Sequence, residues 1–461
     1  MATSMDHAAT TAEAEPDGPA ARRGVRPWTT VWILTLLYAV AYFDKRLITL
    51  LIDPIRATIG ATDLQMSLLS GAAFVSFYVI FSFPIGWAVD RLSRRGIIFW
   101  GVASWSTFAA LGGFARSFWQ LLGSRFGVGA GEAALMPAAH SMIADLFPRE
   151  KLSRALGIFT LGAFIGSALS FAIGGAMLSH FKRGATVDLP LVGALFPWQA
   201  VLLLASLPGI PLALLIFLVR EPARSHGHAP RIGSGGGRAW FGRHKSFYAL
   251  HFIGFSTLAI MTAGFSSWLP THMMRSFGEP VARVGMLLAV FQLTVGPLGM
   301  LLVARTVDRM FKAGRLDIHM SFYVWGVLVL AAAGILVGLA PNATAAYVGV
   351  VLFDSLHGGF LPVAGAVLQL TTPSQFRGQA TAIFFVFYNV MGQALGPIAV
   401  ATSTDLLFGS DRMIGPAIAL TCAIVGPVTA LLLLRSRRPM RAALADAEGV
   451  AAAAATTGNQ N

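Results

Sequence analysis

Three charged residues within apolar segments are the strongest candidates for chemistry. Arg125 and Glu132 lie in the apolar segment 119–145, and Asp44 lies in the apolar segment 28–52. A spacing of seven residues is two helical turns, so Arg125 and Glu132 share one helix face, roughly 10 Å apart along the axis. Charges at such depth are costly and usually face a protein interior or a water-filled cavity. These residues predict a helix that lines a polar path through a membrane.

Asp44 and Arg125 should lie at similar depth. Asp44 is about eight residues from the outer end of its apolar segment and Arg125 is about as far from the outer end of its own, which is roughly 10–15 Å along a helix. If the two helices touch, Asp44 and Arg125 can pair, with Glu132 one step deeper. A carboxylate whose arginine partner can be drawn away is a workable proton switch. We interpret Asp44 and Glu132 as proton-carrying groups and Arg125 as their partner or a substrate anchor. The structural alternative is a static buried ion pair.

The composition indicates an integral membrane protein. Of the 461 residues 55% are hydrophobic and only 12% are charged, whereas soluble domains average about 25% charged residues. The net charge of +13 is carried by short Lys and Arg clusters between apolar runs, which favours a membrane protein over a nucleic-acid-binding surface. The single cysteine, Cys422, leaves no intrachain disulfide and no cysteine-based metal site. We expect no metal, no cofactor and no nucleic-acid partner.

The apolar segments predict an all-α integral membrane protein with twelve transmembrane helices in two pseudo-symmetric six-helix bundles. The segments are 28–52, 66–89, 97–115, 119–145, 153–179, 197–219, 247–271, 281–304, 320–339, 343–369, 378–404 and 413–434. The expected organisation is a disordered tail at 1–27, bundles at 28–219 and 247–434, a basic linker at 220–246 and a disordered tail at 435–461.

The positions of lysine and arginine predict the orientation in the membrane. With both termini on one side, 24 of the 34 Lys and Arg lie in tails and loops on that side and seven on the other. The remaining three, Lys45, Arg46 and Arg125, lie inside apolar segments. Since basic loops stay in the cytoplasm, both termini should be cytoplasmic. We expect the plasma membrane, which in a bacterium is the inner membrane.

The two halves of the chain resemble each other weakly. GWAVDRLSRR begins at Gly86 and ARTVDRMFK begins at Ala304, 218 residues later. EAALMPA begins at Glu132 and HGGFLPV begins at His357, 225 residues later. Repeats at a similar offset indicate duplicated six-helix halves, as in many secondary transporters.

GWAVDRLSRR resembles the loop between helices 2 and 3 of the major facilitator superfamily, Gly-x-x-x-Asp-Arg-x-x-Arg/Lys-Arg/Lys. The resemblance covers about residues 28–438 and implies two halves that rock about a central cavity lined by helices 1, 4, 7 and 10. Gly86 would allow close helix contact, and Asp90 would cap a neighbouring helix. A plain basic loop is the alternative. The implied gating residues are Gly86, Asp90, Arg91, Arg94, Arg95, Asp308 and Arg309.

A closer resemblance is to the Spinster-like branch of that superfamily. It is carried by YFDKRLITLLIDPIR at 42–56 and RFGVGAGEAALMPAAHSMIADLFPRE at 125–150. The branch combines an Asp-Arg pair in helix 1 with Arg-x-x-x-Gly-x-Gly-Glu-Ala in helix 4. The helix 4 pattern matches without gaps, but Lys45 follows Asp44 where the branch usually has arginine, and Arg46 comes next. The resemblance implies lipid-like cargo such as lysophospholipids or sphingoid compounds.

Asp354 and His357 form a second constellation. Their spacing of three residues places them on one helix face, and His357 aligns with Glu132 in the repeat. Histidine titrates near neutral pH and could relay protons, although an ordinary interhelical hydrogen bond explains it equally well. The candidate substrate-binding residues are Tyr42, Arg46, Arg125, Asp354, His357, Asn389 and Gln393.

The sequence therefore predicts a Spinster-like secondary active transporter that moves a small organic or amphiphilic solute by alternating access, with proton coupling as a hypothesis. The alternative within this class is a soluble organic anion held by Arg46 or Arg125. The alternative from another class is a non-transporting membrane receptor. The chain contains no P-loop, nucleophile elbow or HExxH run, so an enzyme has no support. The expected partners are the substrate, protons and membrane lipids, and we expect a monomer.

Overall fold

The computed structural model describes residues 27–181, 186–189, 193–222 and 234–458, which are almost entirely helical. The N-terminal half contains α1 (Pro27–Leu50), α2 (Ile52–Ile59), α3 (Asp63–Ser67), the π-helix η2 (Leu68–Ala72), α4 (Ala73–Val89), α5 (Arg94–Gly112), α6 (Phe118–Glu132), α7 (Leu135–Leu146), α8 (Arg149–His180), β1 (Val187–Leu189), β2 (Gly193–Leu195), α9 (Pro197–Ser206), α10 (Gly209–Ala213) and the 3₁₀-helix η3 (Leu214–Leu218).

The C-terminal half continues with α11 (Ser234–Arg243), α12 (Lys245–Phe277), α13 (Val281–Leu293), α14 (Val295–Lys312), α15 (Ile318–Gly338), α16 (Ala343–His357), α17 (Phe360–Thr371), η4 (Ser374–Phe376), α18 (Arg377–Phe387), η5 (Tyr388–Leu395), α19 (Gly396–Thr402), η6 (Ser403–Phe408), η7 (Asp411–Met413) and α20 (Ile414–Gly458). Of these short elements, η5 and η6 are π-helices, and η4 and η7 are 3₁₀-helices.

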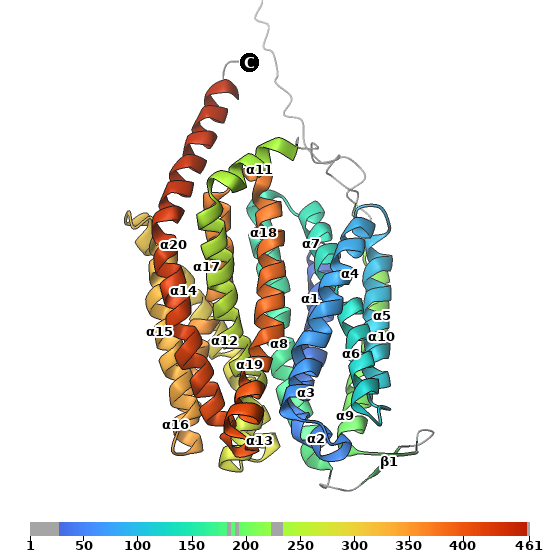
Figure 1. Cartoon of the computed structure of the whole chain (residues 1–461). Coiled ribbons are helices and arrows are strands. Elements are labelled where there is room, and N and C mark those ends of the chain that lie inside the picture. Colours follow the sequence, from blue (N-terminus) through green and yellow to red (C-terminus); the bar gives the residue numbers. More distant parts are fainter. Residues whose placement is uncertain (1–26, 182–185, 190–192, 223–233, 459–461) are drawn as a thin grey trace, which may run out of the picture.

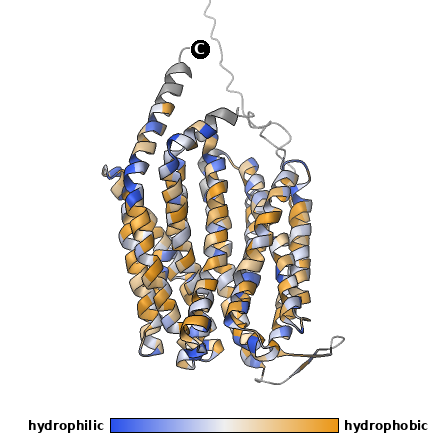
Figure 2. Cartoon of the chain, viewed as in Figure 1, coloured by the Kyte–Doolittle hydropathy of each residue, from blue (hydrophilic) through white to orange (hydrophobic). Residues whose placement is uncertain are grey.

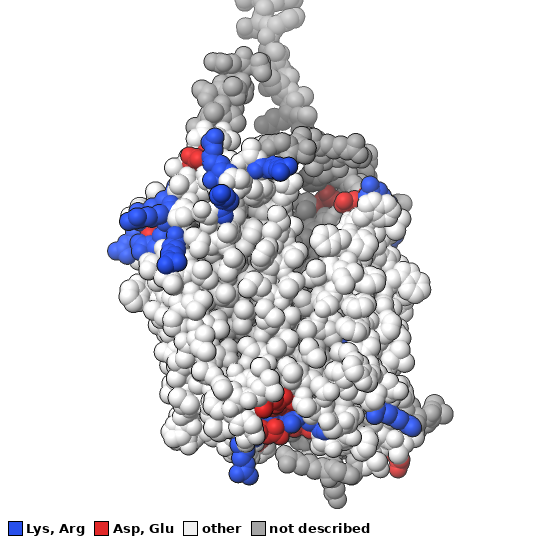
Figure 3. Space-filling model, in the orientation of Figure 1, with Lys and Arg blue, Asp and Glu red and all other residues white. Residues whose placement is uncertain are grey.

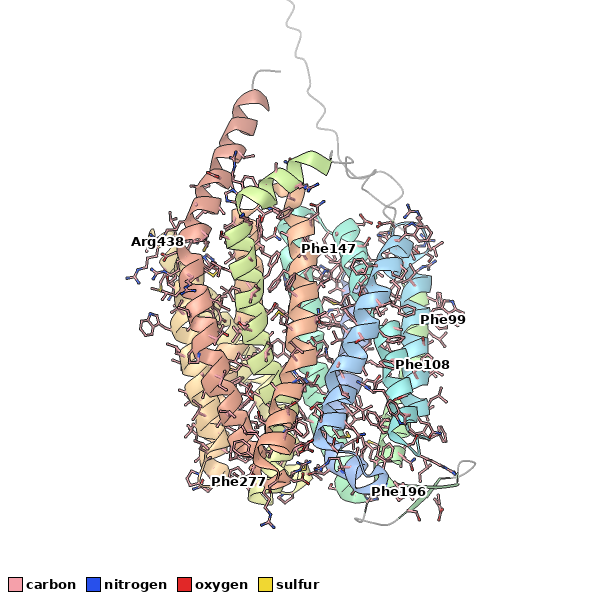
Figure 4. All side chains as sticks on the ribbon, viewed as in Figure 1. Phe99, Phe108, Phe147, Phe196, Phe277 and Arg438 are labelled. Carbon is pink, nitrogen blue, oxygen red and sulfur yellow. The ribbon has the colours of Figure 1, made fainter. Side chains whose placement is uncertain are left out.

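The two halves stand side by side with their long helices roughly parallel (Figure 1). We call the end that carries α11 and the protruding part of α20 the linker face. The opposite end, which carries α2 and the antiparallel pair β1–β2, is the hairpin face. Figure 4 marks the two ends, with Phe147 toward the linker face and Phe196 and Phe277 toward the hairpin face.

The described residues contain nine helical runs that are long and apolar enough to cross a membrane. The helices α1 and α5 and the pair α6–α7 bring the total to the predicted twelve. Each of these three carries buried charge, at Asp44, at Arg94, and at Arg125 with Glu132. Figure 2 shows the apolar band across the helices, and Figure 3 shows the exposed charges gathered beyond its two edges. The helices α1, α5 and the pair α6–α7 are thus less apolar than the other nine because they carry buried charged residues.

Two helices are interrupted at equivalent places in the two halves. Glu132 is the last residue of α6, and His357 is the last residue of α16. Pro137 and Pro362 follow early in α7 and α17. A proline cannot donate to the carbonyl group four residues earlier and collides with it, so the helix breaks there. The break places both predicted titratable residues at a helix end near mid-depth.

The C-terminal end differs from the prediction. The predicted tail at 435–461 continues α20 as far as Gly458. Met440, Ala443 and Ala447 are buried against the C-terminal half, so one face of this alanine-rich helix has a packing surface. Part of the predicted linker 220–246 is also helical, as α11 and the start of α12, while residues 223–233 and the tail 1–26 lie outside the described residues.

The halves pack against each other mainly toward the hairpin face. Here α8 packs on α13, and α3 packs on α19. The approach is close, since a side chain added at Gly285 would place its Cβ 2.2 Å from the carbonyl oxygen of Phe171. On the linker side, α7, α14, α17 and α18 find their main packing partners within their own halves. The molecule is therefore held together at one face.

Candidate transport pathway and gate

The helices α1 and α6 bring the predicted proton-carrying residues together. Asp44 and Arg125 are each 3% exposed and Glu132 is 8% exposed. Arg125 interacts electrostatically with both carboxylates. Lys45 interacts with Glu132, so it belongs to the same group. We call Asp44, Lys45, Arg125 and Glu132 the central charge cluster; its two acidic and two basic groups balance.

The members of the central charge cluster are close but not joined by ion pairs. Among the described residues, neither oxygen of Asp44, nor Nη2 of Arg125, nor Oε1 of Glu132 has a hydrogen-bond partner. Within the described part of the chain, the Arg125 guanidinium makes one long hydrogen bond, from Nε to the Leu69 carbonyl at 3.4 Å. Buried groups without partners are costly, and more so when charged. The predicted proximity of Asp44 and Arg125 is present, whereas the closed pair of the structural alternative is not.

Lys45, the departure from the Spinster-like pattern, points into this cluster. Its ammonium group lies 4.8 Å from the ring centre of Phe74 and 5.7 Å from that of Tyr42. A cation over an aromatic face is stabilised by the ring quadrupole. Lys45 therefore supplies a positive charge beside Glu132, while the next residue, Arg46, lies in the cavity between the halves.

A cavity of about 360 Å³ lies between the halves. Five predicted substrate-binding residues line it: Tyr42, Arg46, Asp354, His357 and Gln393. Both Asp354 and His357 interact electrostatically with Arg46, which reaches them from the opposite half. The cavity therefore combines two cationic groups of the N-terminal bundle, Lys45 and Arg46, with a carboxylate of the C-terminal bundle, Asp354.

Two other predicted substrate-binding residues are not part of the cavity wall. Arg125 lies in the central charge cluster, next to the cavity but not lining it. Asn389 is half-buried, and its Nδ2 donates to the Phe385 carbonyl at 2.8 Å. Asn389 lies in the π-helix η5, where the wider turn changes which side chains share a face. A straight α-helical pattern could not reveal this change.

The sequence interpretation missed an ion cluster at the hairpin face. Arg275 donates to both oxygens of Asp63, at 2.7 and 2.8 Å, and its Nε donates to Asp53 at 2.8 Å. Arg56 lies 3.1 Å from Asp63 and donates to Asp411 at 3.0 and 3.1 Å. We call these five residues the hairpin-face ion cluster; Figure 3 shows acidic and basic side chains side by side at this end of the molecule.

The hairpin-face ion cluster joins the two bundles. Its residues on α2 and α3 belong to the N-terminal half, whereas Arg275 ends α12 and Asp411 begins η7 in the C-terminal half. Asp63 is fully buried. One sequence signal could have revealed this cluster: Asp and Arg occur together at the ends of apolar segments on the side with fewer basic residues. Their spacing along the chain gave no reason to pair any two of them.

Among the predicted gating residues, Arg94 and Arg95 make contacts within their own half. Arg94 is fully buried and forms an ion pair with Asp145, and its Nε lies 3.3 Å from Glu221. Arg95 donates to the Val219 carbonyl at 2.9 Å. These bonds tie the start of α5 to the end of α7 and to the chain after η3.

The remaining motif residues have no neighbouring helix. A Cβ added at Gly86 would have nothing within 4 Å, so the predicted close contact at this glycine is absent. Asp90 is exposed, and Ser93 rather than Asp90 caps a helix, accepting from Gly96 at the start of α5. Arg91 folds back over the ring of Trp87 at 4.4 Å. The physical reason is the separation of the halves at the linker face, which leaves the motif without a partner.

Asp308 and Arg309, the second motif copy, are also exposed. The anchor of this half is Asp317, which accepts from Arg437 at 2.6 Å and pairs with Arg441 at 2.8 Å. Burial acts to raise the pKa of Asp317, but hydrogen bonds from Arg441, Arg437 and Ser321 outweigh it and lower the pKa to about 2. Arg438, between these partners, projects outward from α20 (Figure 4).

The comparisons with known proteins agree with this architecture. The profile of the Major Facilitator Superfamily matches residues 34–397. The chain belongs to the major facilitator superfamily. An MFS-type efflux pump of Mycolicibacterium smegmatis is 26% identical over 391 residues, covering 83% of this chain and 85% of that protein. Protein spinster of Drosophila melanogaster is 25% identical over 405 residues, covering 83% of this chain and only 63% of that protein.

Solved structures show the same fold. A bacterial homolog of the human lysosomal transporter Spinster, in an inward-facing and unoccupied conformation, superposes with a TM-score of 0.75 at 23% identity, covering 91% of this chain and 97% of that one. The predicted twelve-helix fold and the Spinster-like resemblance are thus confirmed. The chain is an integral membrane protein of a family of transporters, related to Spinster proteins and efflux pumps.

Proposed function

We propose that this protein is a proton-coupled secondary active transporter that moves a small organic or amphiphilic solute by alternating access. One observation carries the proposal: a charged cavity lies between two bundles that are joined by ion pairs at one face and packed separately toward the other. A site between two rocking halves is the arrangement that alternating access requires.

Proton coupling rests on the central charge cluster. Its four charges balance when Asp44 and Glu132 are both ionised, and protonating either carboxylate leaves a net positive charge beside the cavity. Both oxygens of Asp44 and Oε1 of Glu132 have no hydrogen-bond partner among the described residues. The ionised forms of the two carboxylates therefore depend on the nearby positive charges, whose distance changes when the helices move. Arg125 and Lys45 stabilise the deprotonated carboxylates of Asp44 and Glu132. When one carboxylate binds a proton, its attraction to these cations is lost, and one cation becomes available to another partner.

The positive-inside pattern supports an orientation with the linker face and both termini in the cytoplasm. The conformation described here is then open toward the cytoplasm and closed on the outside by the hairpin-face ion cluster. In the opposite conformation, Asp90, Arg91, Asp308 and Arg309 would meet the other half at the linker face. The protein would act as a monomer in the plasma membrane, since the cavity is completed within one chain.

A second cargo class, a soluble organic anion, is favoured by the charge of the cavity wall. Lys45 and Arg46 both line the cavity, and Asp354 is the only carboxylate among its lining residues in the described part of the chain. Lipid-like cargo is supported by the resemblance to Spinster proteins rather than by the cavity itself.

Uptake into proteoliposomes with and without an imposed pH gradient tests the proposal. Radiolabelled organic anions and lysolipids would be compared, with the Asp44→Asn, Glu132→Gln double variant as the coupling control. Gradient-dependent accumulation by the wild type that the double variant lacks would support proton coupling. Equal accumulation by both proteins would rule it out.

A further inference from the structure

We propose that the cavity selects a small polar zwitterion, whose anionic group binds Arg46 and whose cationic group binds Asp354. The inference rests on the proposed transport function and assigns a substrate class to the same cavity. It differs from the lipid-like cargo that the Spinster resemblance implies.

The two charges that define the site come from different bundles. Arg46 lies on α1, and Asp354 lies on α16. Nε of Arg46 is buried and has no hydrogen-bond partner among the described residues, and no described residue donates to the Asp354 carboxylate. Asp354 is 8% exposed. Asp354 is therefore a buried carboxylate and Arg46 a half-buried guanidinium, and the two interact electrostatically across the cavity.

A singly charged solute would satisfy only one of these groups. An anion bound at Arg46 would weaken the attraction that holds Asp354 and bring a second negative charge toward that carboxylate. A cation bound at Asp354 would meet Arg46 in the same way. At a buried carboxylate such mismatches are more costly than in solvent. A zwitterion gives each group a partner, so the cavity discriminates by penalising solutes with one charge.

The remaining wall suits a solute that forms hydrogen bonds. The described lining residues that carry a hydroxyl group are Tyr38, Tyr42, Thr160, Ser167, Thr262, Ser266, Ser267 and Tyr388. Gln292 and Gln393 add two amides. These polar groups can bind a compact polar solute more fully than a long acyl chain, which has no hydrogen-bonding groups.

Lys45 does not duplicate the role of Arg46. It lines the cavity but interacts with Glu132, which balances its charge within the central charge cluster. His357 lies one helical turn from Asp354 and also faces Arg46. A neutral His357 can donate to the anionic end of the solute without changing the charge balance. Among the described lining residues, the site therefore presents Arg46 as the cation and Asp354 as the anion that a solute can bind.

The test uses the full chain in lipid nanodiscs and a panel of L-amino acids and dipeptides as probes. Each probe is paired with its N-acetylated form, which lacks the cation, and its C-terminal amide, which lacks the anion. N-methylated forms keep the cation and control for added bulk. We expect thermal-shift titrations to find binding by zwitterions, with both neutralised forms weaker by about 30-fold or more, since leaving a buried charge unpaired costs at least about 2 kcal/mol.

Two variants assign the ends of the solute. Asp354→Asn should remove the preference for a zwitterion over its N-acetylated form, while keeping the preference over the amide. Arg46→Gln should do the reverse. Glu448→Gln, on the exposed surface of α20, is the matched control and should bind as the wild type does.

The inference is overturned if no member of the panel binds, if singly charged forms bind as tightly as zwitterions, or if Asp354→Asn keeps full discrimination. The proposed function fails separately. Gradient-driven uptake of a lysolipid with no zwitterion binding would leave transport standing and remove this inference. Zwitterion binding that follows the predicted pattern without any uptake into proteoliposomes would support the site and contradict the transport function.

Discussion

Two charged groups of similar make-up behave in opposite ways in this molecule. The hairpin-face ion cluster contains three aspartates and two arginines, and its arginines bind carboxylates at 2.6–3.1 Å. The central charge cluster contains two acidic and two basic residues and forms no direct ion pair between them. The first is closed by contacts between the halves, whereas the second lies within one half beside the cavity.

The difference follows from where the side chains are attached. The residues of the hairpin-face ion cluster are at helix ends and on short helices, where the chain can adjust until donors and acceptors meet. The central charge cluster is attached to α1 and α6, which pack mainly on other helices, α8 for α1 and α4 and α5 for α6, rather than on each other. Charges that can pair fully hold a conformation, and charges that cannot pair are sensitive to protons and to substrate.

The largest expected effect comes from neutralising the central charge cluster. Asp44→Asn combined with Glu132→Gln should abolish gradient-driven accumulation, so that the solute only equilibrates across the membrane. Thermal stability should fall only modestly, because Arg125 and Lys45 lose their compensating charges but neither oxygen of Asp44 has a hydrogen bond to lose. Proteoliposome uptake and thermal unfolding measure the two quantities, with Glu448→Gln as control. A large loss of stability with normal coupling would show the cluster to be structural.

Breaking the hairpin-face ion cluster should instead change the conformation. Asp63→Asn removes a partner of both Arg275 and Arg56 and should destabilise the closed hairpin face by about 3 kcal/mol, as expected for a broken buried pair. Spin labels at Ala57→Cys and Ser410→Cys, on opposite halves, should move apart.

Asp188→Asn provides the control for this measurement, since Asp188 is exposed at the same face on β1. The buried Cys422 should not take up label. An unchanged distance in the Asp63→Asn protein would mean that the ion cluster does not hold the face closed.

A moderate, pH-dependent effect is expected at Asp317. Its folded pKa of about 2 lies below the unfolded value of about 3.9. The stabilisation is therefore complete above pH 4 and is lost as the pH falls from about 4 to about 2. With allowance for solvent screening it should amount to about 1–2 kcal/mol. Hydrogen exchange of residues 435–450 should rise in this window, and in Asp317→Asn it should be high already at neutral pH.

The smallest change in stability is expected at the exposed motif. Asp90→Asn should alter unfolding by less than about 0.5 kcal/mol, because nothing packs against this residue in the described conformation. Uptake should nevertheless slow if Asp90 closes the linker face in the opposite conformation. Asp308→Asn is the matched variant in the other half. A loss of stability comparable to that of Asp63→Asn would instead show that Asp90 makes stabilising contacts in the described conformation.

The sequence was informative where one helix determines the geometry. The spacing of Arg125 and Glu132 placed them on one face of α6. The sequence repeat aligned Glu132 with His357, and these two residues are the last residues of α6 and α16, where the two helices are interrupted. It was misleading where the prediction needed a partner from elsewhere. Gly86 has no close neighbour, and the tail from 435 folds as part of α20.

By itself, the sequence determined the membrane class, the twelve spans and the identity of the charged residues at depth, because hydropathy and helical periodicity are local properties. Only the tertiary structure decided which charges meet. Arg275 pairs with Asp63 from 212 residues away. Arg46 interacts with Asp354 in the other half, whereas the preceding residue, Lys45, interacts with Glu132. Electrostatic pairing depends on distance in space, which packing between helices sets and which spacing along one helix does not contain.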